Sequence, residues 1–74
     1  MLSQTEHLIK MANQIAQNTA AYSGTIAINR VKRHLQRYWE PRMLRDLYEY
    51  MDKDGSALLP VVKDAAAEIR NGVI

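Results

Sequence analysis

The stretch LQRYWEPRMLRDL, residues 35–47, joins two helical patterns at a proline. Pro41 lacks the backbone N–H that a helix interior needs and disfavours helical geometry at Glu40, so the first pattern ends there. The same proline suits the first turn of the next helix, where Glu40 can act as an acidic cap at the positive end of the dipole. The sequence therefore predicts two helices that meet at a sharp corner beside Trp39.

Two helices are predicted before this corner. Ser3 and Glu6 form a capping box, which marks the start of the first helix, and Ser23–Gly24 marks its end. Thr25 is the predicted cap of the second helix. Core positions recur every three to four residues, as in helices with one buried face. They are Leu8, Met11, Ala12, Ile15, Ala16 and Thr19 in the first helix, and Ala27, Ile28, Val31, Leu35, Tyr38 and Trp39 in the second.

Two further helices are predicted after the corner. Asp54–Gly55 ends the first of them, Pro60 begins the second, and Asn71–Gly72 ends it. Their core positions are Leu44, Leu47, Tyr48 and Met51, then Leu58 or Val62, Ala65, Ala66 and Ile69. The sequence contains no sustained strand pattern, internal repeat or low-complexity tract. We therefore predict an all-α fold, a small bundle of three to four short helices, in a single domain spanning residues 1–74.

The composition limits what such a domain can do. The 74 residues include no cysteine and two histidines, which excludes disulfides and thiolate metal sites. A chain of this length buries only about 60% of its unfolded surface, so it needs tight helix packing or a partner. A pocket of about 300 Å³ or more would consume most of this core, which argues against an independent enzyme.

Membrane insertion is not expected either. The longest apolar run covers residues 57–62, far below the ~20 residues that a membrane-spanning helix needs. No secretory signal pattern opens the sequence, so we expect a cytoplasmic protein.

The net charge of +2 is unevenly distributed. Residues 30–45 hold six Lys or Arg against one Glu, whereas the remaining C-terminal part is acidic. Arg30, Arg33 and Arg37 share one helix face with Lys32 near its edge, a row that could contact phosphates. Alternatively, this is a solvated face whose arginines pair with acids on a neighbouring helix or a partner. A small nucleic-acid-binding regulator is therefore the alternative function, which the acidic second half opposes.

Other polar groups give no catalytic, cofactor-binding or metal-binding site. Asp52–Gly55 has the look of a calcium loop, but Tyr50 and Val61 would fall at ligand positions, so these residues are better explained as a helix end. His34 has no Ser-His-acid or Cys-His partners in the sequence. We expect a half-buried or interfacial histidine bonded to a carboxylate or carbonyl.

The corner itself has the composition of a protein interface. Tyr38–Met43 combines two aromatic side chains, a rigid proline bend and an arginine. Trp, Tyr and Arg dominate interface hot spots because they bring large contact areas or bidentate hydrogen bonds. Trp39 is therefore either a docking residue or a structural plug of the bundle, and the two roles are compatible.

Three features stand in a fixed order along the chain: MANQIA at residues 11–16, HLQRYWEPRM at residues 34–43, and a turn with Gly55, Leu58 and Pro60 before Ala65. In this order they resemble the delta subunit of soluble NAD-dependent, molybdenum-containing formate dehydrogenases. That family carries an M-A-N-Q-I-A-like opening and an H-L-x-x-F-W-D-P-R-M-like centre. The match extends from about Leu8 to Arg70, with Tyr38 and Glu40 in place of the usual Phe and Asp.

The resemblance implies a non-catalytic accessory subunit of a hetero-oligomeric complex. In that family the alpha subunit holds the molybdopterin-type cofactor and iron–sulfur clusters, and the beta and gamma subunits pass electrons to NAD through FMN. This chain would bind no cofactor and no nucleic acid itself. It would bind, stabilise or help to assemble the complex, through the alpha subunit. The expected interface residues are His34, Tyr38, Trp39, Glu40, Pro41, Arg42 and Met43 at the corner, with Asn13 and Gln14, whose amides can satisfy a partner's backbone groups.

Overall fold

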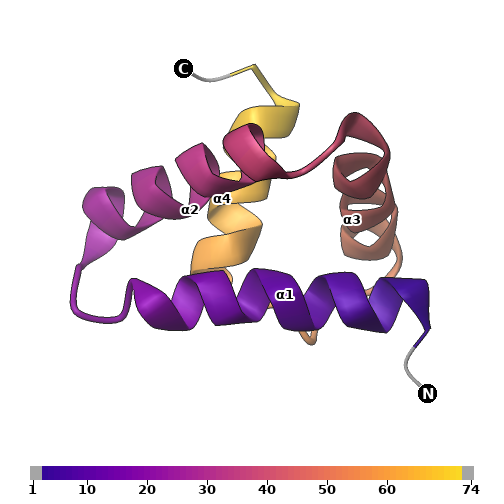
Figure 1. Cartoon of the computed structure of the whole chain (residues 1–74), viewed down its shortest axis with the longest axis horizontal. Helices are drawn as coiled ribbons and strands as arrows, with labels where there is room; N and C mark the ends of the chain where they lie inside the picture. The colour runs from indigo at the N-terminus through magenta and orange to yellow at the C-terminus, as the bar shows by residue number, and fades with distance from the viewer. Residues whose placement is uncertain (1–2, 73–74) are drawn as a thin grey trace.

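The computed structural model describes residues 3–72, which form four helices and no strand. The helices are α1 (Gln4–Asn18), α2 (Gly24–Tyr38), α3 (Pro41–Lys53) and α4 (Pro60–Arg70). Figure 1 shows α1 and α2 joined by a turn at one end of the molecule, α3 at the other end, and α4 running behind both across their direction. The predicted all-α fold, a small helical bundle, is confirmed.

The start of α1 is as predicted, but its end is not. The Ser3 hydroxyl accepts a hydrogen bond from the Glu6 backbone N–H at 3.1 Å, which caps the first turn. The helix then ends at Asn18 rather than at Ser23–Gly24. The Thr19 hydroxyl donates to the Ala16 carbonyl oxygen at 2.7 Å, a local bond that competes with continuation of the helix.

The predicted cap at Thr25 is also wrong. Ser23 is the cap residue, and α2 begins at Gly24, so Thr25 already lies in the first turn. Gly24 has φ = +53°, a left-handed conformation that glycine adopts without a steric cost. Gly24, which was predicted to end α1, therefore forms the sharp turn at the start of α2.

The corner between α2 and α3 forms at the predicted residues. Glu40 has extended backbone geometry (φ −72°, ψ 155°), and Pro41 occupies the first turn of α3. The Leu44 N–H donates to the Glu40 carbonyl oxygen at 3.1 Å, which closes that turn. The Glu40 carboxylate makes no capping hydrogen bond. The predicted cap position of Glu40 is thus confirmed, and its backbone carbonyl makes the hydrogen bond that closes the turn.

The end of α3 confirms that the Asp52–Gly55 segment is a helix terminus. Gly55 has φ = +72°, and its N–H donates to the Tyr50 carbonyl oxygen at 3.1 Å. The Asp54 carboxylate accepts a hydrogen bond from the Ser56 hydroxyl at 2.9 Å, so it belongs to a local turn. The predicted start of α4 at Pro60 and its end before Asn71–Gly72 are likewise confirmed.

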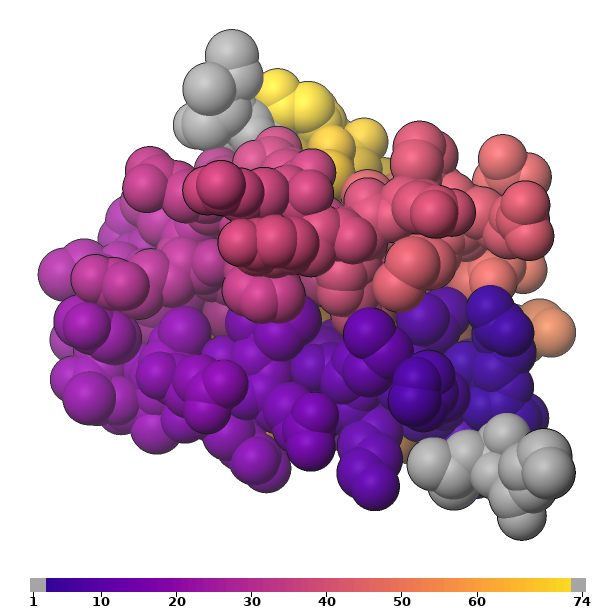
Figure 2. Space-filling model, in the orientation of Figure 1, coloured from indigo at the N-terminus to yellow at the C-terminus, as the bar shows by residue number. Residues whose placement is uncertain are grey.

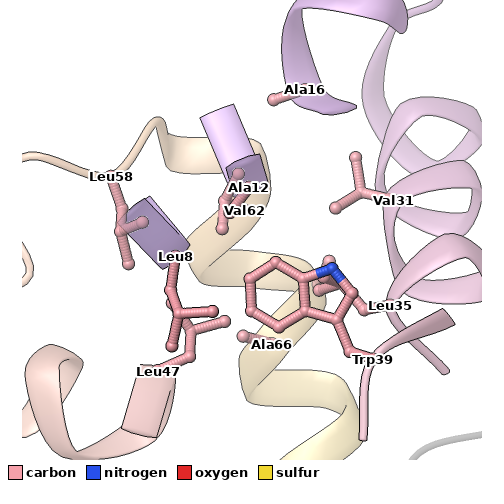
Figure 3. Close-up of a cluster of buried hydrophobic side chains, with 11 residues drawn as sticks. Leu8, Ala12, Ala16, Val31, Leu35, Trp39, Leu47, Leu58, Val62 and Ala66 are labelled. Atoms are coloured by element: carbon pink, nitrogen blue, oxygen red, sulfur yellow. The ribbon is translucent and has the colours of Figure 1, made fainter. Parts of the chain in front are cut away.

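One hydrophobic cluster unites the four helices. Its members are Leu8, Ala12, Ala16, Val31, Leu35, Trp39, Leu47, Leu58, Val62, Ala65 and Ala66. All of them belong to the predicted core positions, and Figure 3 shows the Trp39 indole pointing into the cluster. Tyr38 was predicted in the same stripe but is 62% exposed. Trp39 fills the core at this end of α2, so the preceding side chain, turned by about 100°, faces outward.

A partly buried ion pair joins α2 to α4, which make the most extensive helix–helix contact. The Lys32 Nζ lies 3.0 Å from the Glu68 Oε1, and Lys32 is only 7% exposed. The predicted position of Lys32 at the edge of the arginine row is therefore wrong. Lys32 follows Val31 on the side of α2 that faces α4, and its aliphatic stem is covered there.

Candidate partner-binding surface

The corner residues divide into one buried anchor and an exposed rim. Trp39 is 5% exposed and packs within the chain's own core. Glu40, Pro41 and Arg42 are exposed, and Met43 is half-buried against the core. The structure thus brings these predicted site residues together, with the indole supporting the corner from inside and the other groups facing outward.

His34 and Tyr38 extend this rim along α2. Both are exposed, and their ring centroids lie 4.7 Å apart at an interplanar angle of 47°. Because His34 is exposed, the half-buried alternative of the prediction is wrong, whereas the interfacial alternative stays a prediction. The two residues are one helical turn apart, so their rings contact each other in a tilted arrangement on the outer face of α2.

Asn13 uses its side-chain amide within the chain. Its Nδ2 donates to the Ala57 carbonyl oxygen at 2.8 Å, and its Oδ1 accepts from the Leu59 N–H at 3.0 Å. These two bonds attach α1 to the loop between α3 and α4. The neighbouring Gln14 is exposed and makes no such contact. The Asn13 amide was expected to hydrogen-bond to a partner's backbone, but it bonds to the backbone of its own chain.

A groove of about 630 Å³ runs between the C-terminal part of α1 and the outer face of α2. Figure 2 shows the side chains of these two helices side by side on the face turned to the viewer. Arg30, Arg33 and Arg37 line the groove together with Tyr22 and Ile26, and none of its lining residues is acidic. We call it the arginine groove, and it is larger than a second hollow of about 290 Å³ that Ala16, Ala27 and Val61 help to line.

The arginines of this groove make no ion pair with residues 3–72, so pairing with a neighbouring helix, one of the predicted alternatives, does not occur there, and pairing with a partner stays a prediction. The ion pairs of that part of the chain are Lys32–Glu68 and Arg70–Asp52. The Arg30 guanidinium instead lies 4.0 Å from the centroid of the Tyr22 ring. A guanidinium stacked in this way keeps its N–H edges available for a carboxylate or phosphate.

The apolar wall of the groove escaped the sequence analysis. Ile26 and Tyr22 are 56% and 42% exposed, and they flank the arginines. The signal was a second stripe on α2, in which Ile26 precedes Arg30 by four residues and Arg33 by seven. That stripe is half apolar and half cationic, so hydrophobic periodicity alone does not indicate it.

A smaller electrostatic cluster ties the end of α4 to α3. Arg70 donates two hydrogen bonds to the Asp52 carboxylate, at 2.8 and 2.7 Å. The hydrogen bond from Arg70 lowers the pKa of Asp52. Burial raises the pKa of Tyr48, and the positive charge of Arg70, 5.4 Å from that ring, opposes the rise. This bidentate pair is exposed and holds two helix ends together, with no further chemistry implied.

Two further features of residues 3–72 bear on the type of site. That segment holds no group of three His, Asp or Glu side chains placed to bind a metal ion. None of its helices is long and apolar enough to cross a membrane. The features with the greatest capacity for contacts are the exposed corner and the arginine groove, and both suit a macromolecular surface better than a small substrate.

Comparison with known proteins assigns a family. The family model described as NADH-dependent formate dehydrogenase delta subunit FdsD matches residues 7–66 of the 74. No curated protein and no solved structure matches the chain. The matched segment includes both the MANQIA and the HLQRYWEPRM segments, which confirms the resemblance described above. The chain therefore belongs to the family of formate dehydrogenase delta subunits.

Proposed function

We propose that this chain is a non-catalytic accessory subunit of a cytoplasmic NAD-dependent molybdenum formate dehydrogenase. It binds the complex through the alpha subunit and stabilises it or helps to assemble it. The family match over residues 7–66 is the observation that carries this proposal. The corner and groove, with exposed aromatic and arginine side chains, are consistent with a binding role.

Under this proposal the redox groups reside in the larger subunits. The molybdopterin-type cofactor, the iron–sulfur clusters, FMN and the NAD site belong to the alpha, beta and gamma chains. The absence of cysteine from this sequence supports the assignment, because iron–sulfur clusters are held by cysteine thiolates.

The exposed corner is the proposed contact surface. His34, Tyr38, Glu40, Pro41 and Arg42 lie on its outside, and the proline fixes its shape at low entropic cost. Trp39 and Met43 contribute by holding the corner against the core. Gln14, exposed on α1, is available for a peripheral hydrogen bond.

Co-purification tests the proposed function. A tagged chain expressed in its native host should retain the formate dehydrogenase subunits at a fixed ratio through size-exclusion chromatography. Elution of the chain alone, well folded by circular dichroism, would contradict the proposal.

A matched pair of variants tests the contact surface. Arg42→Ala should weaken binding by about tenfold, the loss typical of an interface arginine. Arg45 is also an exposed arginine of α3 but lies outside the predicted set, so Arg45→Ala should leave the dissociation constant within about twofold. Equal effects of the two substitutions would place the contact elsewhere.

A further inference from the structure

The arginine groove carries more cationic and apolar surface than the fold requires. Its three arginines are exposed and bind no acid of residues 3–72, whereas the lysine of the same helix is buried and paired. Surface arginines contribute little to stability, so the fold gives no reason to gather three of them along one groove. The groove therefore has the character of a site for a ligand with negative charge.

The spacing of the arginines defines that ligand further. Arg30 and Arg37 are seven residues apart on α2, so their attachment points span ~10 Å along the helix axis. Carboxylates two helical turns apart span about 11 Å, close to this distance. Carboxylates on alternate positions of an extended chain are about 7 Å apart, close to the ~6 Å along the axis between Arg33 and Arg37. The stacking of Arg30 on Tyr22 orients one guanidinium before any ligand arrives.

The apolar wall distinguishes a protein ligand from a nucleic acid. Ile26 is 56% exposed and lines the groove beside Tyr22, so an apolar side chain of a ligand can be covered there. A phosphate backbone has no group that gains from contact with an isoleucine. The acidic residues of the C-terminal part of the chain would also repel a long polyanion.

We propose that the arginine groove binds an acidic polypeptide segment of a partner subunit. Carboxylates of that segment pair with Arg30, Arg33 and Arg37, and one of its apolar side chains packs against Tyr22 and Ile26. This inference rests on the proposed function, since it takes the partner to be a subunit of the formate dehydrogenase complex. It adds a contact surface that adjoins the corner, since His34 and Tyr38 also line the groove, and it states the chemistry of what occupies that surface.

A charge-reversal pair tests the groove. The probe is the purified complex of alpha, beta and gamma subunits without the delta chain, titrated into fluorescently labelled chain. Arg33→Glu/Arg37→Glu should weaken binding by about 100-fold, because each reversal replaces an attraction by a repulsion. Lys10→Glu/Lys53→Glu changes the net charge equally at exposed positions outside the groove and should weaken binding by no more than a few fold. Circular dichroism of both double variants, which should match the wild-type helicity, is the control for folding.

The outcomes separate the two proposals. Failure of the wild-type chain to bind the complex would overturn both. Wild-type binding that Arg33→Glu/Arg37→Glu leaves unchanged would overturn the groove alone. If Arg33→Glu/Arg37→Glu loses affinity for a DNA or RNA oligonucleotide but keeps its affinity for the complex, the groove proposal is also overturned. If the three arginines contact three phosphates of a duplex, the affinity for that oligonucleotide should fall about 40-fold between 50 and 200 mM salt.

A crosslinking experiment tests the chemistry of the partner segment. Asn29 lines the groove and is exposed, so a photoreactive benzoylphenylalanine at this position can reach a bound chain. Irradiation of the reconstituted complex should attach it to a segment with several Asp or Glu residues around an apolar one. The same group at Glu49, exposed on α3, serves as the control. Attachment to a segment without carboxylates, or equal yields at both positions, would overturn the proposal.

Discussion

Replacing Trp39 by alanine distinguishes the structural plug from the docking residue. The indole is 5% exposed and belongs to the cluster that joins all four helices. An aromatic side chain buries about 150–250 Å², and at about 25 cal/mol per Å² this corresponds to about 4–6 kcal/mol. Measured substitutions of buried Phe or Trp by Ala cost about 3–5 kcal/mol, and we expect that range.

Such a loss is large for this chain. With 74 residues, a stability of about 0.05–0.15 kcal/mol per residue gives about 4–11 kcal/mol in total. Each kcal/mol lowers the Tm of a domain of this size by about 4–8 °C, so Trp39→Ala should lower it by at least ~12 °C. Thermal and urea unfolding of the isolated chain, followed by circular dichroism at 222 nm, measures the effect.

The adjacent aromatic residue supplies the control. Tyr38 is 62% exposed, so Tyr38→Ala should change the free energy of unfolding by no more than about 0.5 kcal/mol. If Trp39→Ala is as stable as the wild-type chain but binds the formate dehydrogenase complex more weakly, the reasoning is refuted. The indole would then act as a docking group and not as a plug.

Three further perturbations probe the fold and its electrostatics. Asn13→Ala removes two hydrogen bonds to the α3–α4 loop and should cost about 1–3 kcal/mol in urea unfolding, whereas Gln14→Ala, one residue away and exposed, should stay within about 0.5 kcal/mol. Gly55→Ala should cost about 1–2 kcal/mol because φ is +72°, and Gly55→Asn should cost less, since asparagine tolerates this conformation; equal losses would contradict the backbone explanation. Arg70→Gln should raise the pKa of Asp52 toward its ordinary value, as measured by NMR titration of the carboxyl carbon. Because the native pKa is lowered, the pair stabilises the fold above the unfolded-state pKa and loses this effect as the pH falls, so wild-type and Arg70→Gln stabilities should converge in acid.

Helix boundaries set by proline, and burial set by strong periodicity, could be predicted from the sequence. Pro41 and Pro60 each remove one N–H and fix φ, so the starts of α3 and α4 depend on little else. The α1–α2 turn was predicted less well because two residues compete there. Thr19 ends α1 with its own hydroxyl, and this leaves Gly24 to begin α2.

The candidate surface was only partly predictable, because sequence spacing does not say which groups meet from different elements. Asn13 was recognised as a hydrogen-bonding residue, but its partners lie 44 and 46 residues away in the chain. The arginine row was visible in the sequence, yet its isoleucine and tyrosine wall depends on how α1 lies against α2. Lys32 lies outside the arginine row because it is on the side of α2 against which α4 packs.

The link from Asn13 to the α3–α4 loop has a consequence for local motion. The Leu59 N–H precedes α4 and is protected by a side chain of α1. In native-state hydrogen exchange, the rate at this amide should therefore report the free energy needed to detach α1 from the loop. It should be slower than the rate of an unprotected loop amide. An Asn13→Ala chain should release it to fast exchange. The Leu59 amide is thus a single-site reporter of whether the first helix is in place, both in the free chain and when a partner binds.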